Sequence, residues 1–366
     1  MKVPLESFRD PGIVRELAGA IRRTAAGLGR LRIMHVCGTH EHELRRHALR
    51  ELLPEGLELI AGPGCPVCIT PASAIITARR LALLDGGNIV AAYGDVLRVP
   101  TRAGSLADGR SEGGDVRLVY GVPDALRLAR ENPARQVIFF SVGFETTAAP
   151  VAALLGRGDL PGNFSIYTCH RYVPGAVEAL VAGDAEGSLG GFLLPGHASA
   201  ITGADAYEFL PARYNRPAAV AGFEPVDILR GVLSILEQAA SGSPRVANCY
   251  ERAVRKEGNR KAQSLLNEIF DLTDARWRGI GILPGTGFEL KRGLEGVSAL
   301  ARFGIEEETA EDLMPGCRCH LVMMGKCAPE GCVLFGKECT PDSPRGPCMV
   351  GGEGTCRAHF MYGGRI

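Results

Sequence analysis

Short apolar runs alternate along most of this chain with polar loops and with longer stretches of helical periodicity. Each run has four to seven residues and ends at a loop that contains Gly, Pro or Cys. The runs lie at 31–36, 57–61, 89–93, 116–120, 136–142, 164–168, 191–194 and 218–221. Short apolar runs bounded by turn residues predict buried strands, and the periodic stretches between them predict helices.

The first predicted helix begins after Asp10. An Asp at this place suits the N-cap position, and Pro11 suits the first helical residue. Ile13, Leu17 and Ile21 then recur on one helical face.

Strands that alternate with helices of ten or more residues are typical of βαβ units, so we predict an α/β fold with parallel sheets. Eight such strands in about 200 residues favour two parallel-sheet domains over one. We place the N-terminal helix and the first α/β domain in 1–118 and the second α/β domain in 119–240. A helical return and a strand at 279–283 that joins the first domain occupy 241–299. The last domain, 300–366, is rich in Cys and poor in apolar periodicity, so it is expected to need a metal for its fold.

Composition limits the possible partners. Lys and Arg number 41 and Asp and Glu also number 41, so no global charge attracts nucleic acid or an anionic membrane. No apolar stretch approaches the roughly 18 residues of a membrane span. The first six residues lack the apolar core of a secretory signal. We therefore expect a cytoplasmic protein.

The cysteines are distributed unevenly. Five of the twelve precede residue 317, and seven lie between 317 and 356. The cytoplasm keeps thiols reduced, so a disulfide scaffold is not expected there. Metal or cluster binding is the more natural interpretation.

The loop after the first predicted strand gathers several reactive groups. Its residues are Cys37, Gly38, Thr39, His40 and Glu41. In an open α/β sheet, ligands bind at such strand ends. A helix beginning here, with Thr39 as its N-cap, would favour the thiolate of Cys37. The alternative is that Cys37 is a small buried hydrophobe.

A second loop carries Cys65-Pro66-Val67-Cys68 between Gly64 and a predicted helix. Two thiols at this spacing can form a disulfide, bind one metal or transfer electrons. No second C-x-x-C lies at the spacing of a zinc ribbon, which disfavours zinc.

The C-terminal cysteines give the stronger signal. They are Cys317, Cys319, Cys327, Cys332, Cys339, Cys348 and Cys356. Four thiolates suit either an iron–sulfur cluster or zinc, and spacing alone does not separate the two. The surplus thiols are hard to reconcile with a closed zinc site.

The histidines divide by position. His40 and His197 fall on loops at predicted strand ends and are candidate ligands or acid–base groups. His35 lies within a predicted strand and is expected to be a core residue. Four others are expected to be exposed or incidental: His42, His47, His320 and His359. Glu145 and Glu224 also follow predicted strands.

Several of these strings together resemble one protein family. They are Cys37-Gly38-Thr39-His40-Glu41, Gly62-Pro63-Gly64-Cys65-Pro66-Val67-Cys68, Ser141-Val142-Gly143-Phe144-Glu145-Thr146-Thr147, Pro195-Gly196-His197, Gly222-Phe223-Glu224-Pro225, Leu334-Phe335-Gly336 and Glu353-Gly354-Thr355-Cys356. The chain resembles the [NiFe]-hydrogenase maturation proteins of the HypD family over nearly its whole length. The resemblance implies two α/β domains around a cleft and a third, iron–sulfur domain that carries a [4Fe–4S] cluster.

The resemblance also implies roles for individual residues. Cys37 is similar to the thiol that holds the iron of an Fe(CN)2CO group, with Thr39, His40 and Glu41 beside it. Cys65 and Cys68 resemble a redox-active pair. The cluster ligands implied are Cys317, Cys332, Cys339 and Cys356, with Cys319 as the alternative to Cys317.

The family's implied partners are a HypC-like chaperone, a HypE-like cyanide donor and, indirectly, the hydrogenase large subunit. The implied function is assembly of the Fe(CN)2CO group, with the cluster supplying electrons. Two other functions stay open on the residues alone. One is an iron–sulfur-dependent thiol–disulfide oxidoreductase that acts on a protein, and the other is a zinc-stabilised binding module.

Overall fold

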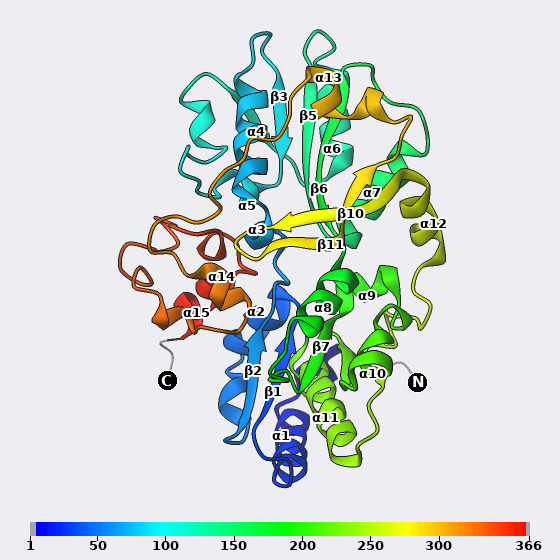
Figure 1. Cartoon of the computed structure of the whole chain (residues 1–366), viewed down its shortest axis with the longest axis vertical. Coiled ribbons are helices and arrows are strands. Elements are labelled where there is room, and N and C mark those ends of the chain that lie inside the picture. Colours follow the sequence, from blue (N-terminus) through cyan, green and yellow to red (C-terminus); the bar gives the residue numbers. More distant parts are fainter. Residues whose placement is uncertain (1–4, 364–366) are drawn as a thin grey trace.

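The computed structural model describes residues 5–363 as an α/β protein with two sheets (Figure 1). The lower sheet in Figure 1 has the strand order β2-β1-β7-β8-β9, and all its strands are parallel. Its strands are β1 (Leu31–His35), β2 (Leu57–Ala61), β7 (Gly191–Pro195), β8 (Ala218–Ala221) and β9 (Val246–Asn248).

The upper sheet has the order β10-β11-β6-β5-β3-β4. Its strands are β3 (Ile89–Ala92), β4 (Asp115–Leu118), β5 (Val137–Gly143), β6 (Phe164–Arg171), β10 (Phe270–Trp277) and β11 (Gly281–Leu290). Strands β3 to β6 run parallel, whereas β11 pairs antiparallel with both β6 and β10. The sequence therefore predicted the α/β class and the mostly parallel sheets correctly.

Helices cover both faces of the lower sheet. Ile33 and Leu193 pack with α1 (Pro11–Ala25) and α11 (Pro225–Ser241), whereas the next residues, Met34 and Leu194, face α8 (Val173–Ala182). Because side chains alternate between the faces of a strand, the strands must be apolar throughout. Helices α9 (Gly196–Thr202) and α10 (Phe209–Tyr214) complete the second face.

The upper sheet is covered in the same way. Ile89 and Phe139 contact the cluster of α6 (Val122–Glu131), α7 (Glu145–Leu155) and α12 (Arg260–Ile269). Val90 and Phe140 contact the opposite cluster, made by α4 (Ala72–Leu83), α5 (Gly94–Leu97) and α13 (Ala299–Phe303).

The predicted cap of the first helix is also confirmed, because the Asp10 carboxylate accepts from the N–H groups of Gly12 and Ile13.

The chain passes between the two sheets three times. The segment 1–118 gives β1 and β2 to the lower sheet and β3 and β4 to the upper one, and 119–240 divides in the same manner. The sheets therefore do not coincide with these two segments. The segment 241–299 gives β9 to the lower sheet and the β10–β11 hairpin to the upper one.

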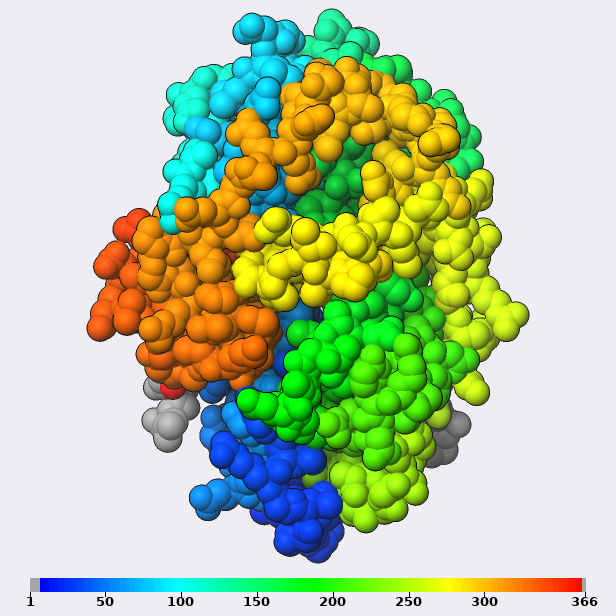
Figure 2. Space-filling model, in the orientation of Figure 1, coloured from blue at the N-terminus to red at the C-terminus, as the bar shows by residue number. Residues whose placement is uncertain are grey.

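The remaining elements position the cysteines. Helices α2 (Gly38–Arg46) and α3 (Pro66–Ile69) follow β1 and β2, and the C-terminal segment contains α14 (Cys319–Met323) and α15 (Thr355–Tyr362). Figure 2 shows this segment, orange to red, along one side of the molecule, with the yellow hairpin crossing the front. Short 3-10 helices lie at Leu5–Arg9, Leu49–Leu52, Asp108–Arg110, Asp205–Tyr207, Glu295–Val297, Pro329–Gly331 and Pro347–Met349. The prediction that the start of the chain lacks a secretory signal falls partly on residues 1–4, which lie outside the described part of the chain.

Candidate functional site

Three distant segments meet at two glycines. The N–H of Gly38 donates to the carbonyl of Gly64 at 3.1 Å, which joins the loop after β1 to the loop after β2. A methyl group on Gly64 would overlap the backbone of Cys37, and one on Gly38 would overlap Glu353. Only residues without a side chain permit this approach. Cys37, the Cys65–Cys68 loop and Glu353 are therefore neighbours.

Cys37 occupies the N-cap position of α2, at the end of β1, and is 6% exposed. Burial, followed by the nearby Glu353 carboxyl, raises the pKa of its thiol to about 12. The N–H groups of His40 and Thr39 act in the opposite direction but more weakly. The first-turn N–H groups therefore favour the thiolate as predicted, but desolvation outweighs them and the thiol form prevails.

Thr39 does not cap the helix as predicted. It lies in the first turn of α2, and its hydroxyl donates to Oε1 of Glu353 at 3.0 Å. Burial raises the pKa of this carboxyl above its ordinary value, whereas the hydrogen bond from Thr39 lowers it. Glu353 is thus a site residue that the sequence reasoning did not single out.

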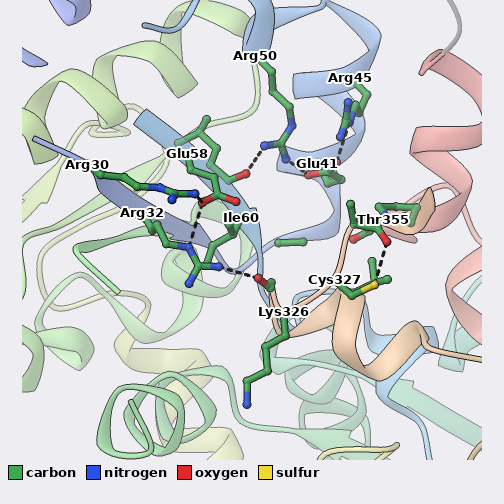
Figure 3. Close-up of a pocket in the computed structure, with 16 residues that line it drawn as sticks. Arg30, Arg32, Glu41, Arg45, Arg50, Glu58, Ile60, Lys326, Cys327 and Thr355 are labelled. Atoms are coloured by element: carbon green, nitrogen blue, oxygen red, sulfur yellow. Dashed lines mark hydrogen bonds and ion pairs between the residues drawn. The ribbon is translucent and has the colours of Figure 1, made fainter. Parts of the chain in front are cut away.

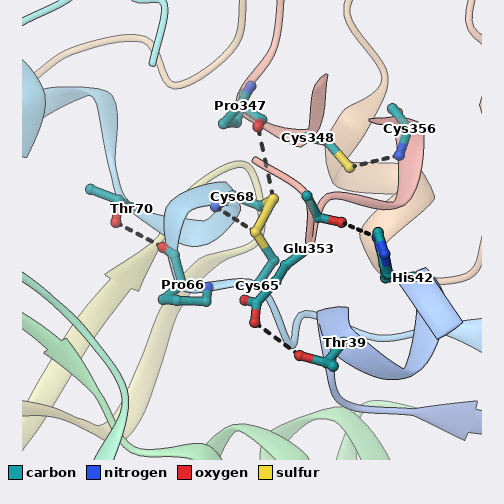
Figure 4. The surroundings of a disulfide bond; sticks show 11 residues. Thr39, His42, Cys65, Pro66, Cys68, Thr70, Pro347, Cys348, Glu353 and Cys356 are labelled. Atoms are coloured by element: carbon teal, nitrogen blue, oxygen red, sulfur yellow. Dashed lines mark hydrogen bonds between the residues drawn. A yellow bond between two sulfur atoms is a disulfide. The ribbon is translucent and has the colours of Figure 1, made fainter. Parts of the chain in front are cut away.

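Cys65 and Cys68 form a disulfide across the first turn of α3 (Figure 4). Cys65 is the N-cap of this helix, and its sulfur accepts from the N–H of Cys68 at 3.2 Å. The sulfur of Cys68 lies 3.9 Å from the carbonyl oxygen of Pro347, the residue before Cys348. The disulfide therefore lies between the Cys37 loop and the C-terminal cysteines.

Six C-terminal cysteines line one small cavity, closed by Leu334, Phe335 and Met349. They are the four predicted cluster ligands, Cys317, Cys332, Cys339 and Cys356, together with Cys319 and Cys348. Backbone N–H groups point at the sulfurs: Arg345 donates to Cys339 at 3.3 Å and Cys356 donates to Cys348 at 3.2 Å.

The cavity has features that a cluster site requires: several thiols, an apolar wall and N–H donors to sulfur. Within 5–363, no three His, Cys, Asp or Glu side chains are close enough together to hold a single metal ion. A cluster of four irons needs its thiolates spread around a larger volume, in an apolar setting with N–H donors to sulfur. Cys317 and Cys319 line the cavity together, and the neighbouring Cys319 thiol lowers the pKa of Cys317 below its ordinary value.

The chain is similar to known proteins over nearly its whole length. The family model for HypD, described as "Hydrogenase formation hypA family", matches residues 12–363. The chain is 40% identical to hydrogenase maturation factor HypD2 of Bradyrhizobium diazoefficiens, over 98% of this chain and 96% of the relative. It is 39% identical to hydrogenase maturation factor HypD of Azotobacter vinelandii, with the same coverage. A putative hydrogenase expression/formation protein of Methanocaldococcus jannaschii is 40% identical, over 97% and 99% of the two chains.

The chain belongs to the HypD family.

In this HypD-family chain, two of the residues predicted beside Cys37 are engaged elsewhere. His40 is fully buried, and its Nε2 donates to the carbonyl of Gly222 at 2.9 Å. Burial lowers the pKa of His40 to about 3, so the ring is neutral. The carboxylate of Glu41 pairs with Arg45 and Arg50, which hold its pKa below the ordinary value against the opposing effect of burial.

The other histidines divide differently from the prediction. His35 is buried as expected, and its Nε2 lies 2.8 Å from Glu41. His359 was expected to be exposed or incidental, but only 9% of its surface is exposed, because α15 packs against α2. Its side chain pairs with Glu330. His197 stacks on Phe223, with ring centroids 3.9 Å apart.

None of the helices within residues 5–363 combines the length and the apolar character that crossing a bilayer requires.

Replacement of Gly64 by Ala should destabilise the fold. The new methyl group meets backbone atoms of Cys37, which cannot move independently of β1. We expect the free energy of unfolding to fall by about 1–3 kcal/mol in chemical denaturation. The matched control is Gly352→Ala, in the third segment of the same junction, where no atom lies within 4 Å of the added methyl. Equal stability of the two variants would contradict the close approach.

Replacement of Glu353 by Gln should make Cys37 more reactive. In metal-free protein, alkylation of Cys37 by iodoacetamide should keep rising from pH 8 to pH 10, because its pKa is about 12. An ordinary thiol, with a pKa of about 8.5, levels off over this range. Removal of the neighbouring carboxylate lowers the pKa, so Glu353→Gln should alkylate Cys37 several-fold faster at pH 9. Mass spectrometry of the Cys37 peptide measures the rate.

The exposed Glu338→Gln serves as the control for that substitution. If Glu353→Gln left the rate of Cys37 alkylation unchanged, the electrostatic role of Glu353 would be disproved.

Proposed function

We propose that this chain is a hydrogenase maturation factor that holds an iron ion while CN and CO ligands are added to it. The product is the Fe(CN)2CO group of the [NiFe]-hydrogenase active site. The observation that carries the proposal is the meeting of a lone thiol, a C-x-x-C disulfide and a six-cysteine cavity at one junction. The names of the relatives, hydrogenase maturation factors at about 40% identity, support it.

Cys37 is the proposed protein ligand of this iron. Iron that carries cyanide and carbon monoxide is electron-rich, so a soft thiolate suits it. Metal binding replaces the thiol proton, and a thiol with a pKa of about 12 must release this proton as the metal arrives. The Glu353 carboxylate accepts a hydrogen bond from Thr39 and lies beside Cys37, so it is placed to receive that proton. A buried ligand of this kind also keeps water from the bound ion.

The disulfide is the proposed electron relay. Its reduction breaks the S–S bond, consumes two electrons and two protons and yields the two thiols of Cys65 and Cys68. Gly64, next to Cys65, packs against the backbone of Cys37, and the Cys68 sulfur lies 3.9 Å from the carbonyl oxygen of Pro347, next to the cavity residue Cys348, so the pair has a neighbour on each side. Oxidation of the two thiols would return two electrons to chemistry at the iron.

A [4Fe–4S] cluster is the proposed resident group of the cavity. Cys332, Cys339 and Cys356 would hold it with Cys317, while Cys319 donates a hydrogen bond to that fourth sulfur. When bound there, such a cluster would provide one-electron chemistry beside the disulfide. The apolar wall of Leu334, Phe335 and Met349 would keep water from the cluster.

The proposed partners are a HypC-like chaperone, which shares the iron, and a HypE-like protein, which donates cyanide. The hydrogenase large subunit would receive the finished group indirectly. A cytoplasmic location suits the reduced thiols that this chemistry needs.

The second candidate is a thiol–disulfide oxidoreductase that acts on a protein substrate. The observation that favours it is the formed disulfide at a helix N-terminus. It differs from the first candidate because it predicts disulfide turnover without any iron–cyanide bound.

Replacement of Cys37 by Ala should abolish binding of the iron–diatomic group. Protein isolated without air, together with its HypC-like partner, should show CO and CN stretching bands in the infrared, and C37A should lack them. The visible absorbance of the cluster should stay unchanged. The matched control is Cys249→Ala, a half-buried thiol packed against α11 rather than at the junction. Survival of the bands in C37A would refute the role of Cys37, and disulfide turnover without bands in the native chain would favour the second candidate.

Metal analysis should find about four iron atoms per chain and no zinc. We expect Cys339→Ser to remove most of this iron and the brown colour. Cys327→Ser should keep both, because Cys327 does not line the cysteine cavity. A colourless protein with one zinc would instead identify a structural zinc module.

A further inference from the structure

A separate cavity of about 530 Å³ opens between the lower sheet, α2 and the loop after α14 (Figure 3). We call it the arginine cavity. Arg30 and Arg32 line it at the start of β1, and Arg45 and Arg50 line it from α2 and the turn that follows. Residues 325–329 of the C-terminal segment close its third side.

The arginine cavity is positively charged although the whole chain is neutral. Four arginines and one lysine line it, against only two carboxylates. Guanidinium groups stay protonated at every physiological pH, so the excess is permanent. Both carboxylates are already paired: Glu41 with Arg45 and Arg50, and Glu58 with Arg32 at 3.1 Å.

Several arginine N–H groups are left over after this pairing. Arg45 bonds Glu41 through Nε alone, and within residues 5–363 its two terminal nitrogens make no hydrogen bond. Arg30 comes only to 3.6 Å from Glu58. The Nε of Arg50 is buried and, in the described part of the chain, has no partner. The Arg45 and Arg30 side chains are 20% and 78% exposed, so an anion that enters the cavity can reach their free N–H groups and form charge-assisted hydrogen bonds with them.

We propose that the arginine cavity binds a small multivalent oxyanion. Planar guanidinium groups bind the paired oxygens of phosphate or carboxylate groups with two parallel hydrogen bonds. The volume lies in the lower half of the usual range for ligand cavities, about 300–1,000 Å³. None of the lining residues in the described structure is aromatic, so no ring is available to stack on a base or another flat group. The ligand class is therefore a compact polyphosphate or polycarboxylate.

The arginine cavity also touches both parts of the cysteine site. Glu41 and Arg45 belong to α2, which begins after Cys37, and Thr355 precedes Cys356. A bound anion competes with Glu41 for Arg45 and Arg50, so binding changes the ion pairs that α2 makes. The binding proposal itself does not depend on the iron-carrying function and is measured without iron.

Calorimetric titration at constant ionic strength tests the proposal. Pyrophosphate and citrate are titrated into the full chain, with acetate as the monovalent comparison. We expect one saturable site for at least one of the two multivalent anions and none for acetate. Tighter binding of pyrophosphate identifies a phosphorylated ligand, and tighter binding of citrate identifies a polycarboxylate.

Arg45→Gln should weaken the binding about tenfold, through loss of a charged two-point contact. Its matched control is Arg46→Gln, the next residue of α2, whose guanidinium is half exposed and pairs with Glu43 outside the cavity. The exposed Arg30→Gln gives a second measurement should R45Q fail to fold, and it should weaken binding in the same direction. Absence of saturable binding by either multivalent anion, or an equal loss in R46Q, would overturn the proposal.

Discussion

The site depends on the close approach of backbone at Gly38 and Gly64. Here the ends of two neighbouring parallel strands, β1 and β2, meet a loop that lies about 300 residues later in the chain. A side chain at either glycine would displace Cys37 or Glu353. Because the carboxyl ends of β1 and β2 lie side by side, the thiol and the disulfide need no flexible loop to meet. The same junction brings the C-terminal cysteines to the disulfide.

Burial is the second constraint, and it determines the protonation states. Cys37 stays a thiol in the metal-free protein because water is excluded from it, and His40 stays neutral for the same reason. A protonated, buried thiol is protected from oxidation, since the thiolate is the reactive form. Glu41, on α2, is buried but keeps its charge, because Arg50, the hydrogen bond with His35 and Arg45 together outweigh the cost of burial. These ion pairs anchor the helix that carries Cys37.

Local patterns predicted much of the fold and less of the site. The eight predicted apolar runs all correspond to strands, because burial on both faces demands continuous apolar sequence. Strand β10 falls within the predicted helical return and was missed, since polar side chains at its exposed positions hide the alternating pattern of a strand. The sequence also did not predict which strands belong to which sheet. For example, β1 pairs with β7, which lies about 160 residues later in the chain. For the same reason Glu353 was assigned no role and Cys348 was left among the surplus thiols, because only tertiary contact distinguishes them.

The most direct test of the central claim is anomalous diffraction at the iron edge, from crystals grown without oxygen. The account predicts a strong iron peak inside the cavity bounded by Cys332, Cys339 and Cys356, beside the Cys65–Cys68 pair and the thiol of Cys37. No iron peak there, or a single peak at the zinc edge instead, would contradict it.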